Sequence, residues 1–347
     1  MRSVNSMHIA TDVADSPIDP HAPVLRRREW IAFTAAFMAA PALAQAQAQQ
    51  YPSSKPIRLL NGFAAGGGSD IVVRLVAPAL GAELKATMIV ENKTGASGMI
   101  AADHVAKSAP DGYTLLVTPG SAVMIAPQTS PKPPFDALTD LVPINTIGGS
   151  PLVISVHPSL GVRTLKDLVA LSRTRKISMA SAGTGTMTHL VIELLIKSTG
   201  DNFTHVAYKG SSPGIVDAIG GHVDGIVSDI SSAMQHFNEG RLIPLAVTSA
   251  QRFDQLPNVP TANDTLPGLT AVSWTCAFAP AKTPQAILDK LSDAIVRVVA
   301  RDDISASLKQ NGLIPVTYRD PAAFRTFVAE EYARWGKLIR EKHIVTS

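Results

Sequence analysis

The stretch Ile57–Asp70, IRLLNGFAAGGGSD, joins an apolar run to a glycine-rich turn and decides the fold class. Its first half, Ile57–Phe63, is a short apolar run typical of a buried strand. Beyond Asp70, apolar residues repeat at intervals of three and four as far as Leu84, which predicts a helix. Pro78 lies inside this helix and is expected to kink it. A strand, a glycine-rich loop and a helix in this order form the basic unit of an α/β protein.

The same alternation continues along the chain. We expect further helices at 98–109, 165–172, 186–198 and 215–219, and further strands at 87–91, 113–118, 152–156, 177–180, 205–208, 225–228 and 243–248. Alternating strands and helices predict an α/β fold with largely parallel sheets. The chain has 347 residues and 46% hydrophobic content, enough for about two domains of ~150 residues each.

Composition excludes several classes of protein. Charged residues make up 17% and aromatic residues 5% of the chain, which argues against both a disordered acidic protein and a coiled coil. The net charge of +3 is spread without a Lys/Arg block, so we expect no nucleic-acid partner. Cys276 is the one cysteine, which excludes an internal disulfide and any cysteine-based metal site. We expect its thiol to be buried as a small apolar group.

Residues 1–46 have the pattern of a secretory signal peptide preceded by an N-terminal extension. Arg26–Arg28 come before the uncharged run Trp30–Leu43, which is shorter than the about 20 residues that span a bilayer. Ala44-Gln45-Ala46 then offers a small-x-small cleavage site. We therefore expect export to the periplasm by the Sec or the twin-arginine route. An uncleaved membrane anchor is the alternative.

Three strand-to-helix loops, at 63–70, 181–189 and 208–213, are rich in glycine and hydroxyl groups. Glycines leave backbone N–H groups uncovered, and a helix N-terminus adds partial positive charge. Such a loop can bind an anion without an arginine or lysine. All three loops follow the carboxyl ends of strands, where ligands bind in open α/β sheets. Together they predict a site for a small carboxylate, although one such loop alone can serve tight packing only. Asp70 most simply caps its helix.

Enzyme motifs are mostly missing. The sequence contains no GxSxG, GxxxxGK[ST] or HExxH, and Gly183–Thr188 lacks the third glycine of a dinucleotide fingerprint. We therefore predict no catalytic residue, no metal and no cofactor. His189 and Glu193 share a helix face, but we expect His189 to line the cleft rather than to hold a metal or act as a base. A hydrolase using Ser181 or Ser69 with His189 is the alternative, and it needs a base within about 2.6–3.2 Å of the hydroxyl.

The chain resembles the Bug family of TctC-like proteins, the periplasmic substrate-binding proteins of tripartite tricarboxylate transporters. The resemblance covers nearly all of residues 51–347, in order. It rests on the strings at 63–70, 90–98, 109–115, 181–186 with His189, 205–210, Gly220-Gly221, 246–249 with Arg252, 256–261 and Trp335-Gly336. The family's usual prolines are replaced by Ala65 and Ala207, and Pro78 interrupts the first helix. We interpret these departures as affecting loop stiffness or ligand choice and not the fold.

The resemblance implies an α/β type II periplasmic binding protein fold, with two α/β lobes, a ligand cleft and two hinge crossings. The first lobe would comprise 51–150 and 250–347, and the second 151–249. The implied ligand is a small organic acid whose carboxylate meets backbone N–H groups and hydroxyls at the first two loops. The implied ligand-binding residues are Phe63, Ala64, Gly66, Gly67, Ser69, Asp70, Thr118, Ser181, Ala182, Gly183, Thr184, Thr186, His189 and Asp229.

The leading interpretation is a non-catalytic solute-binding protein that closes over a carboxylate and then docks on membrane subunits of a tripartite transporter. Ligand contacts to both lobes, made only in the closed state, would favour closure. The alternative output is a signal to a sensor kinase. We expect a monomer. We also hypothesise that an acidic Asp229 near the cleft favours a ligand bearing an amine or hydroxyl over a tricarboxylate.

Overall fold

The computed structural model describes residues 51–200 and 202–345. The predicted signal peptide, 1–46, lies outside the described residues. The chain from Gln50 to Ser347 forms one compact unit. None of the described helices combines the length and the apolar character that crossing a membrane requires.

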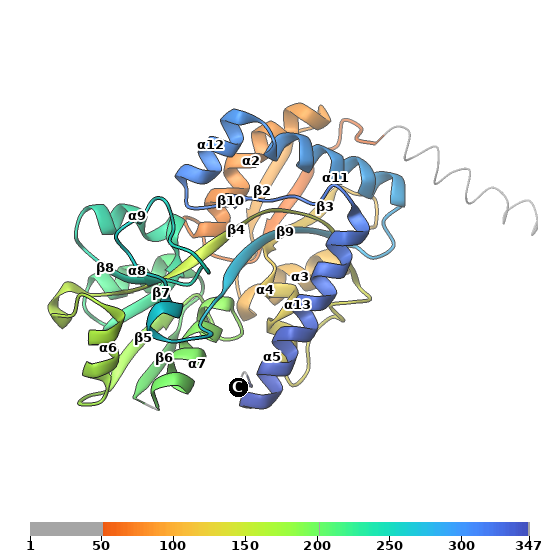
Figure 1. Cartoon of the computed structure of the whole chain (residues 1–347). Helices are drawn as coiled ribbons and strands as arrows, with labels where there is room; N and C mark the ends of the chain where they lie inside the picture. The colour runs from red at the N-terminus through yellow and green to blue at the C-terminus, as the bar shows by residue number, and fades with distance from the viewer. Residues whose placement is uncertain (1–50, 201, 346–347) are drawn as a thin grey trace, which may run out of the picture. The chain divides into compact units, whose positions relative to one another are not determined.

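The described strands form one curled sheet of ten strands in the order β2-β1-β3-β9-β4-β7-β5-β6, and both β8 and β10 also pair with β4 (Figure 1). In chain order the strands are β1 Ile57–Asn61, β2 Met88–Asn92, β3 Thr114–Pro119, β4 Leu141–Val156, β5 Ile177–Ser181, β6 Phe203–Ala207, β7 Gly225–Asp229, β8 Ile243–Val247, β9 Val272–Pro280 and β10 Ile314–Pro315. Helices cover these strands, which explains why they read as continuous apolar runs.

The long strand β4 joins two lobes. Its first part, Leu141–Pro151, pairs with β9, and its last part, Leu152–Val156, pairs with β7 and β8. We call the part built on β1–β3, β9, β10 and the start of β4 the first lobe. The second lobe is built on β5–β8 and the end of β4. The chain enters the second lobe along β4 and returns between β8 and β9. The residue limits predicted for the lobes remain a prediction.

The expected parallel pairing holds only away from β4 and β9. β1 pairs in parallel with β2 and β3, and β5 pairs in parallel with β6 and β7. Every pairing that involves β4 or β9 is antiparallel. The expectation of largely parallel sheets is therefore wrong for the middle of the sheet, because the two strands that link the lobes run against their neighbours.

The described α-helices follow the strands closely. They are α2 Gly68–Leu84, α3 Met99–Ala106, α4 Ser121–Met124, α5 Ala126–Thr129, α6 Leu165–Ser172, α7 Met187–Thr199, α8 Ser211–Ile219, α9 Ile230–Asn238, α10 Ala262–Thr265, α11 Gln285–Val299, α12 Asp302–Gln310 and α13 Pro321–Lys342. The five helices predicted by pattern are confirmed as α2, α3, α6, α7 and α8, and α2 continues through Pro78.

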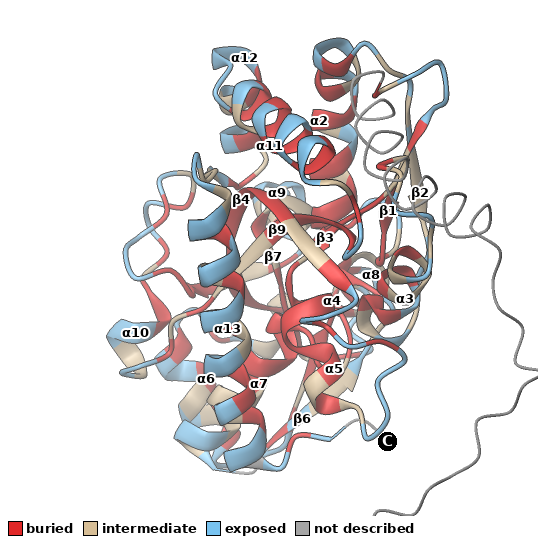
Figure 2. Cartoon of the chain, turned by 90° about the vertical axis from the view of Figure 1, so that its right-hand side faces the viewer, coloured by how far each residue is buried: buried red, intermediate tan, exposed pale blue. Residues whose placement is uncertain are grey.

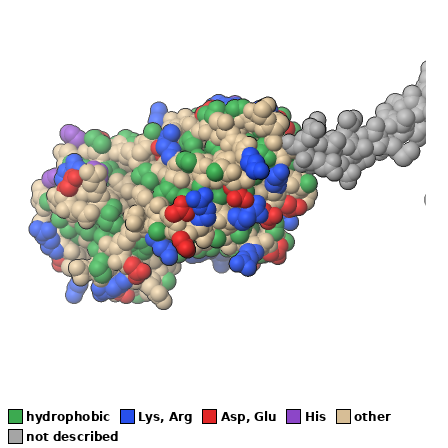
Figure 3. Space-filling view, turned by 90° about the horizontal axis from the view of Figure 1, so that it is seen from above, with side chains coloured by type: hydrophobic (Ala, Val, Ile, Leu, Met, Phe, Trp, Pro, Cys, Tyr) green, Lys and Arg blue, Asp and Glu red, His purple; other side chains and the backbone are tan. Residues whose placement is uncertain are grey.

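Buried residues concentrate in the sheet and on the inner faces of the helices (Figure 2). Phe278 on β9 and Phe324 on α13 are the largest fully buried side chains. Cys276 is also fully buried, as expected, and burial raises the pKa of its thiol to about 12. On the face shown in Figure 3, acidic and basic side chains are interspersed, as a small net charge leads one to expect.

Thr248 ties the two crossings together. Its hydroxyl accepts a hydrogen bond from the Leu152 N–H at 2.9 Å and donates one to the Ala271 carbonyl at 2.6 Å. Leu152 lies on the outgoing crossing and Ala271 directly before the returning strand β9. Thr248 is fully buried, so water cannot replace either bond.

We therefore expect Thr248→Val to lower the free energy of unfolding by about 2–4 kcal/mol, because it leaves one buried donor and one buried acceptor unpaired. Urea denaturation measures this loss. Thr174→Val is the matched control, since its hydroxyl also bonds a backbone carbonyl, at 2.8 Å, but on the surface. A loss no larger than that of the control would contradict the role given to Thr248.

Candidate ligand-binding site

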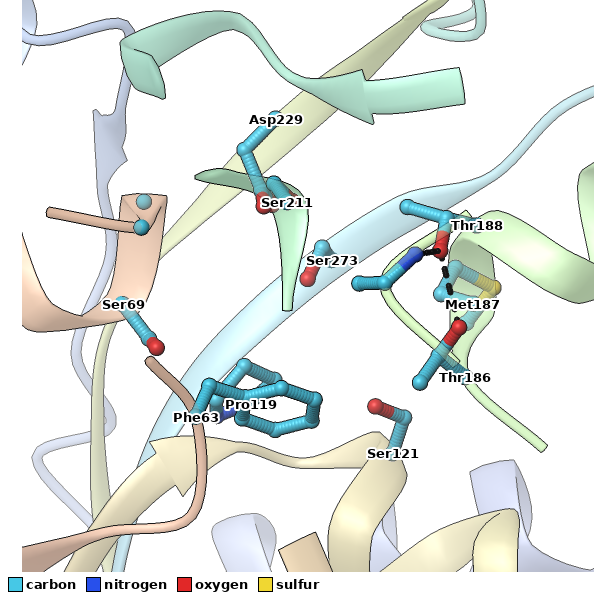
Figure 4. Close-up of a pocket in the computed structure, with 13 residues that line it drawn as sticks. Phe63, Ser69, Pro119, Ser121, Thr186, Met187, Thr188, Ser211, Asp229 and Ser273 are labelled. Carbon is cyan, nitrogen blue, oxygen red and sulfur yellow. Dashed lines mark hydrogen bonds between the residues drawn. The ribbon is translucent and has the colours of Figure 1, made fainter. Parts of the chain in front are cut away.

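A cavity with about 350 Å³ of empty space, part of it open to solvent, lies between the two lobes (Figure 4). The first lobe contributes Phe63, Gly67, Gly68, Ser69, Pro119, Ser121 and Ser273, and the second contributes Ala182, Thr186, Met187, Thr188, Ser211 and Asp229. Hydroxyl groups therefore face the cavity from both lobes. No lysine or arginine is among the described residues that line it.

The first loop is held in place from behind by Asp70. The Asp70 carboxylate accepts hydrogen bonds from the Gly66 N–H at 2.9 Å, the Asn92 amide at 2.8 Å and the Arg74 guanidinium at 3.0 Å. Asn92 also donates to the Phe63 carbonyl at 3.0 Å. Burial raises the pKa of Asp70, but these hydrogen bonds outweigh it and lower that pKa overall. Asp70 thus fastens the loop, whereas the expectation was a helix cap.

This fastening leaves the start of α2 facing the cavity. The N-cap of α2 is Gly67, which offers no side-chain cap for the first helical N–H groups. Gly66 has φ +75°, a left-handed conformation that glycine adopts without strain. Gly67, Gly68 and Ser69 then line the cavity. The sequence thus brings an uncapped helix N-terminus, with its partial positive charge, to the cavity wall.

The second loop presents the start of α7 from the other lobe. Its N-cap is Thr186, whose hydroxyl accepts from the His189 N–H at 3.3 Å and donates to the Gly183 carbonyl at 2.6 Å. The Thr188 hydroxyl accepts from the Ala182 N–H at 3.0 Å. These bonds fold the loop tightly over β5. As a result Ala182, Thr186 and Thr188 all line the cavity.

A stacked pair of histidines lies behind the second loop, on the side away from the cavity. The rings of His189 and His205 lie 4.0 Å apart between centroids at an interplanar angle of 22°. His189 Nδ1 accepts from the Gly185 N–H at 3.1 Å, and its Nε2 lies 3.1 Å from Glu193. His205 Nε2 lies 2.6 Å from the Ser181 hydroxyl. Burial, and then the neighbouring His189, lower the pKa of His205 to about 4.

The structure brings some of the predicted residues to the cavity and leaves others behind it. Phe63, Gly67, Ser69, Ala182, Thr186 and Asp229 line it. Gly183 and Thr184 line an adjoining pocket, which shares Phe63 and Ala182 with the first. The predicted residues that line neither are Ala64, Gly66, Asp70, Thr118, Ser181 and His189.

Several of the predicted residues that line neither pocket lie directly behind the residues that do. The Thr118 hydroxyl accepts from the Gly62 N–H at 3.2 Å and donates to Asn61 at 3.3 Å. Ser181 is fully buried, and its oxygen also accepts from the Gly183 N–H at 3.1 Å. His189 is buried under the loop and is not among the described residues that line the cavity, so its place in the cleft stays a prediction.

The sequence reasoning missed Gly68, Pro119, Ser121, Met187, Thr188, Ser211 and Ser273. Ser211 belongs to the third glycine- and serine-rich loop, so its signal was present. Ser273 lies on β9, which reaches the site by antiparallel pairing with β4. No motif in the sequence marks that position.

The two lobes touch across the cavity. The Ser97 hydroxyl donates to the Thr184 carbonyl, and the Ser212 hydroxyl donates to the Ala65 carbonyl at 3.4 Å. Phe63 from the first lobe forms a small apolar cluster with Ala122 and with Ala182 from the second. These contacts describe a closed arrangement of the lobes.

We expect acid to destabilise the protein through His205. Its folded-state pKa of about 4 lies below the ordinary value of 6.5, so the unfolded chain binds a proton before the folded one does. The contribution is complete above pH 6.5 and is lost as the pH falls from 6.5 toward 4. Because the ring is only partly buried, we expect a loss of about 1–2 kcal/mol.

Thermal unfolding of wild type and His205→Gln between pH 7.5 and 4 measures this contribution. The variant should lose correspondingly less stability on acidification than wild type. His222→Gln, at an exposed histidine, is the control and should behave like wild type. Equal losses in all three proteins would contradict the assignment.

Comparisons with known proteins were consistent with each other. The profile described as "Tripartite tricarboxylate transporter family receptor" matches residues 72–344. Protein BugT of Bordetella pertussis is 33% identical over 302 residues, which cover 86% of this chain and 92% of BugT.

Solved structures of periplasmic binding proteins are also similar to this chain. An R. palustris protein solved with adipate has a TM-score of 0.81 and 30% identity over 85% of this chain and 99% of its own. MatC from Rhodopseudomonas palustris, solved with bound malate, has a TM-score of 0.79 and 28% identity over 83% of this chain and 100% of its own. The periplasmic binding protein BugD has a TM-score of 0.80 and 29% identity, covering 86% of this chain and 100% of BugD.

Proposed function

Because this chain belongs to the tripartite tricarboxylate transporter receptor family, we propose that it captures a small organic carboxylate between its lobes and delivers it to membrane subunits of such a transporter. The observation that carries this proposal is the cavity itself. Both lobes line it with hydroxyl groups and helix N-termini, and they touch around it.

The donor groups suit a carboxylate. The N-termini of α2 and α7 reach the cavity with Gly68 and Ser69 on one side and Met187 and Thr188 on the other. A partly buried anion at one helix N-terminus gains roughly 0.3–2 kcal/mol. The Ser121 hydroxyl adds a neutral donor. Two of the similar solved proteins carry adipate and malate, which supports the same class of ligand here.

Closure follows from the same geometry. A ligand that contacts both Ser69 and Thr186 makes all of its contacts only when the lobes are together. It therefore stabilises the closed state by its extra affinity for that state. The closed protein then presents one surface, formed by both lobes, to its membrane partner.

The proposed role requires no catalysis. The positions of Ser181 and Ser69 do not support the hydrolase alternative. Ser181 pairs with His205 and not with His189, and it is fully buried behind the loop. The Ser69 hydroxyl donates to Asn61 at 3.0 Å. Neither hydroxyl is thus placed beside a histidine at the cavity wall among the described residues.

Thermal unfolding with a panel of organic acids tests ligand capture. An acid at one hundred times its dissociation constant should add about 2.7 kcal/mol, which raises the melting temperature by roughly 5–10 °C. The corresponding amides, which lack the negative charge, are the control and should give no shift. If none of the acids raises the melting temperature, the proposed ligand class is contradicted.

Delivery is tested separately, by uptake of the stabilising acid in cells with and without this chain. Loss of uptake is the expected result. Unchanged uptake together with a confirmed ligand would contradict delivery and favour signalling to a sensor kinase.

A further inference from the structure

Asp229 places a carboxylate in the cavity wall without a cationic partner. It receives a hydrogen bond from the Ser211 hydroxyl at 3.2 Å, and Ser273 lines the cavity with it. No lysine, arginine or histidine is among the described residues that line the cavity with it. Asp229 is half-buried and meets only neutral groups. A carboxylate in such a place lacks the charged partner that a group withdrawn from water needs.

Three helix N-termini already surround this carboxylate. Asp229 directly precedes α9, and Ser211, which donates to it, is the first residue of α8. Gly68, the first residue of α2, packs against it so closely that a Cβ there would lie 2.7 Å from the Asp229 Cβ. Asp229 therefore offsets the partial positive charge that α8 and α9 bring to this side. A ligand carboxylate placed here would meet a like charge.

The opposite side remains suited to an anion. In Figure 4, Asp229 and Ser211 lie on one side of the pocket, while Thr186, Met187 and Thr188 approach from the start of α7. Asp229 is the one acidic residue among the described lining residues. A ligand carboxylate at α7 thus leaves the rest of the ligand directed toward Asp229.

We propose that Asp229 accepts a hydrogen bond from a hydroxyl or ammonium group of the ligand, and that the site therefore selects hydroxy and amino carboxylic acids over acids without such a donor. This inference rests on the proposed function and names its substrate class. Burial raises the pKa of Asp229, and a ligand donor would lower it again by stabilising the ionised form. The Ser231 hydroxyl lies beside Gly68 and has no hydrogen-bond partner among the described residues.

Calorimetric titration of the purified protein with two matched sets of acids tests the inference. Succinate, L-malate and L-aspartate differ only in the group on one carbon, as do propionate, L-lactate and L-alanine. Within the set that binds, the hydroxy or amino acid should bind at least tenfold more tightly than the plain acid. In Asp229→Asn this advantage should fall below threefold. Asp289→Asn, which removes an exposed carboxylate on α11, should leave it unchanged.

The outcomes are distinct. A plain acid that binds as tightly as its hydroxy and amino counterparts overturns the inference but agrees with the proposed function. An advantage that persists in Asp229→Asn overturns the role of Asp229. If no acid of either set binds, both the proposed function and this inference fail. If Asp229→Asn does not fold, the wild-type affinities and Ser211→Ala, which removes one donor to Asp229, decide the question.

Discussion

Gly68→Ala is expected to weaken ligand binding at least tenfold without destabilising the free protein. A Cβ at this position would lie 2.7 Å from both the Asp229 Cβ and the Ser231 Oγ, which belong to the other lobe. Real Cβ atoms do not approach so closely, so the lobes cannot close fully. In the open protein the same alanine sits at the start of a helix, where it is favoured over glycine by up to about 1 kcal/mol.

Calorimetry with the acid that stabilises wild type, together with thermal unfolding of the free protein, separates these two effects. The matched control is Gly67→Ala, one residue earlier in the same loop. Its Cβ would come no nearer than 3.2 Å, to the Ala64 carbonyl, so its loss of affinity should be much smaller. Equal losses in both variants, or a Gly68→Ala protein that binds like wild type, would contradict closure at this contact.

Asp70→Ala is expected to lower the free energy of unfolding by about 3 kcal/mol and to weaken ligand binding as well. Asp70 is 3% exposed, and its removal leaves the Gly66 N–H and the Asn92 amide without their shared acceptor. Loss of charged hydrogen bonds in a buried site costs about 1.5–3 kcal/mol each, less what water recovers at half-exposed Arg74. The first loop then loses its fixed shape, and the start of α2 is no longer held at the cavity wall.

Urea denaturation measures the stability of this variant, and calorimetry its affinity. Glu341→Ala is a suitable control, because it also removes an i,i+4 ion pair, with Lys337, but one that is exposed. Such pairs contribute about 0.3–0.5 kcal/mol. A loss in Asp70→Ala as small as that in the control would show that the carboxylate does not fasten the loop.

Much of the fold could be predicted from periodicity. Helix α6 was predicted with its observed limits, and α2 and α7 to within two residues, because each carries a clear apolar repeat and a glycine or hydroxyl at its start. The strand β4 was predicted only over 152–156. Its earlier part contains Pro143, Gly148 and Gly149, which usually mark turns. The structure accommodates them with two register shifts against β9.

Site residues could be predicted from the sequence only where they lie within a single strand-to-helix loop. Residues of the first two loops follow a strand and begin a helix, so their place at the cavity was readable from the sequence. Ser273 could not be found in this way, because its position depends on antiparallel pairing across the sheet. Ser181 is assigned to the cleft by resemblance alone, and His189 also by its place near a helix start. The structure places both behind the loop. There Ser181 pairs with His205 and accepts from the Gly183 N–H, and His189 accepts from the Gly185 N–H.

Hydrogen–deuterium exchange with and without the stabilising acid tests the central claim most directly, because it reports each loop separately. If the acid is held between the lobes, the backbone amides at 67–69 in the first lobe and at 186–188 in the second should both gain protection at the same acid concentration. Protection confined to one lobe, or found only at segments away from the cavity, would contradict capture between the lobes.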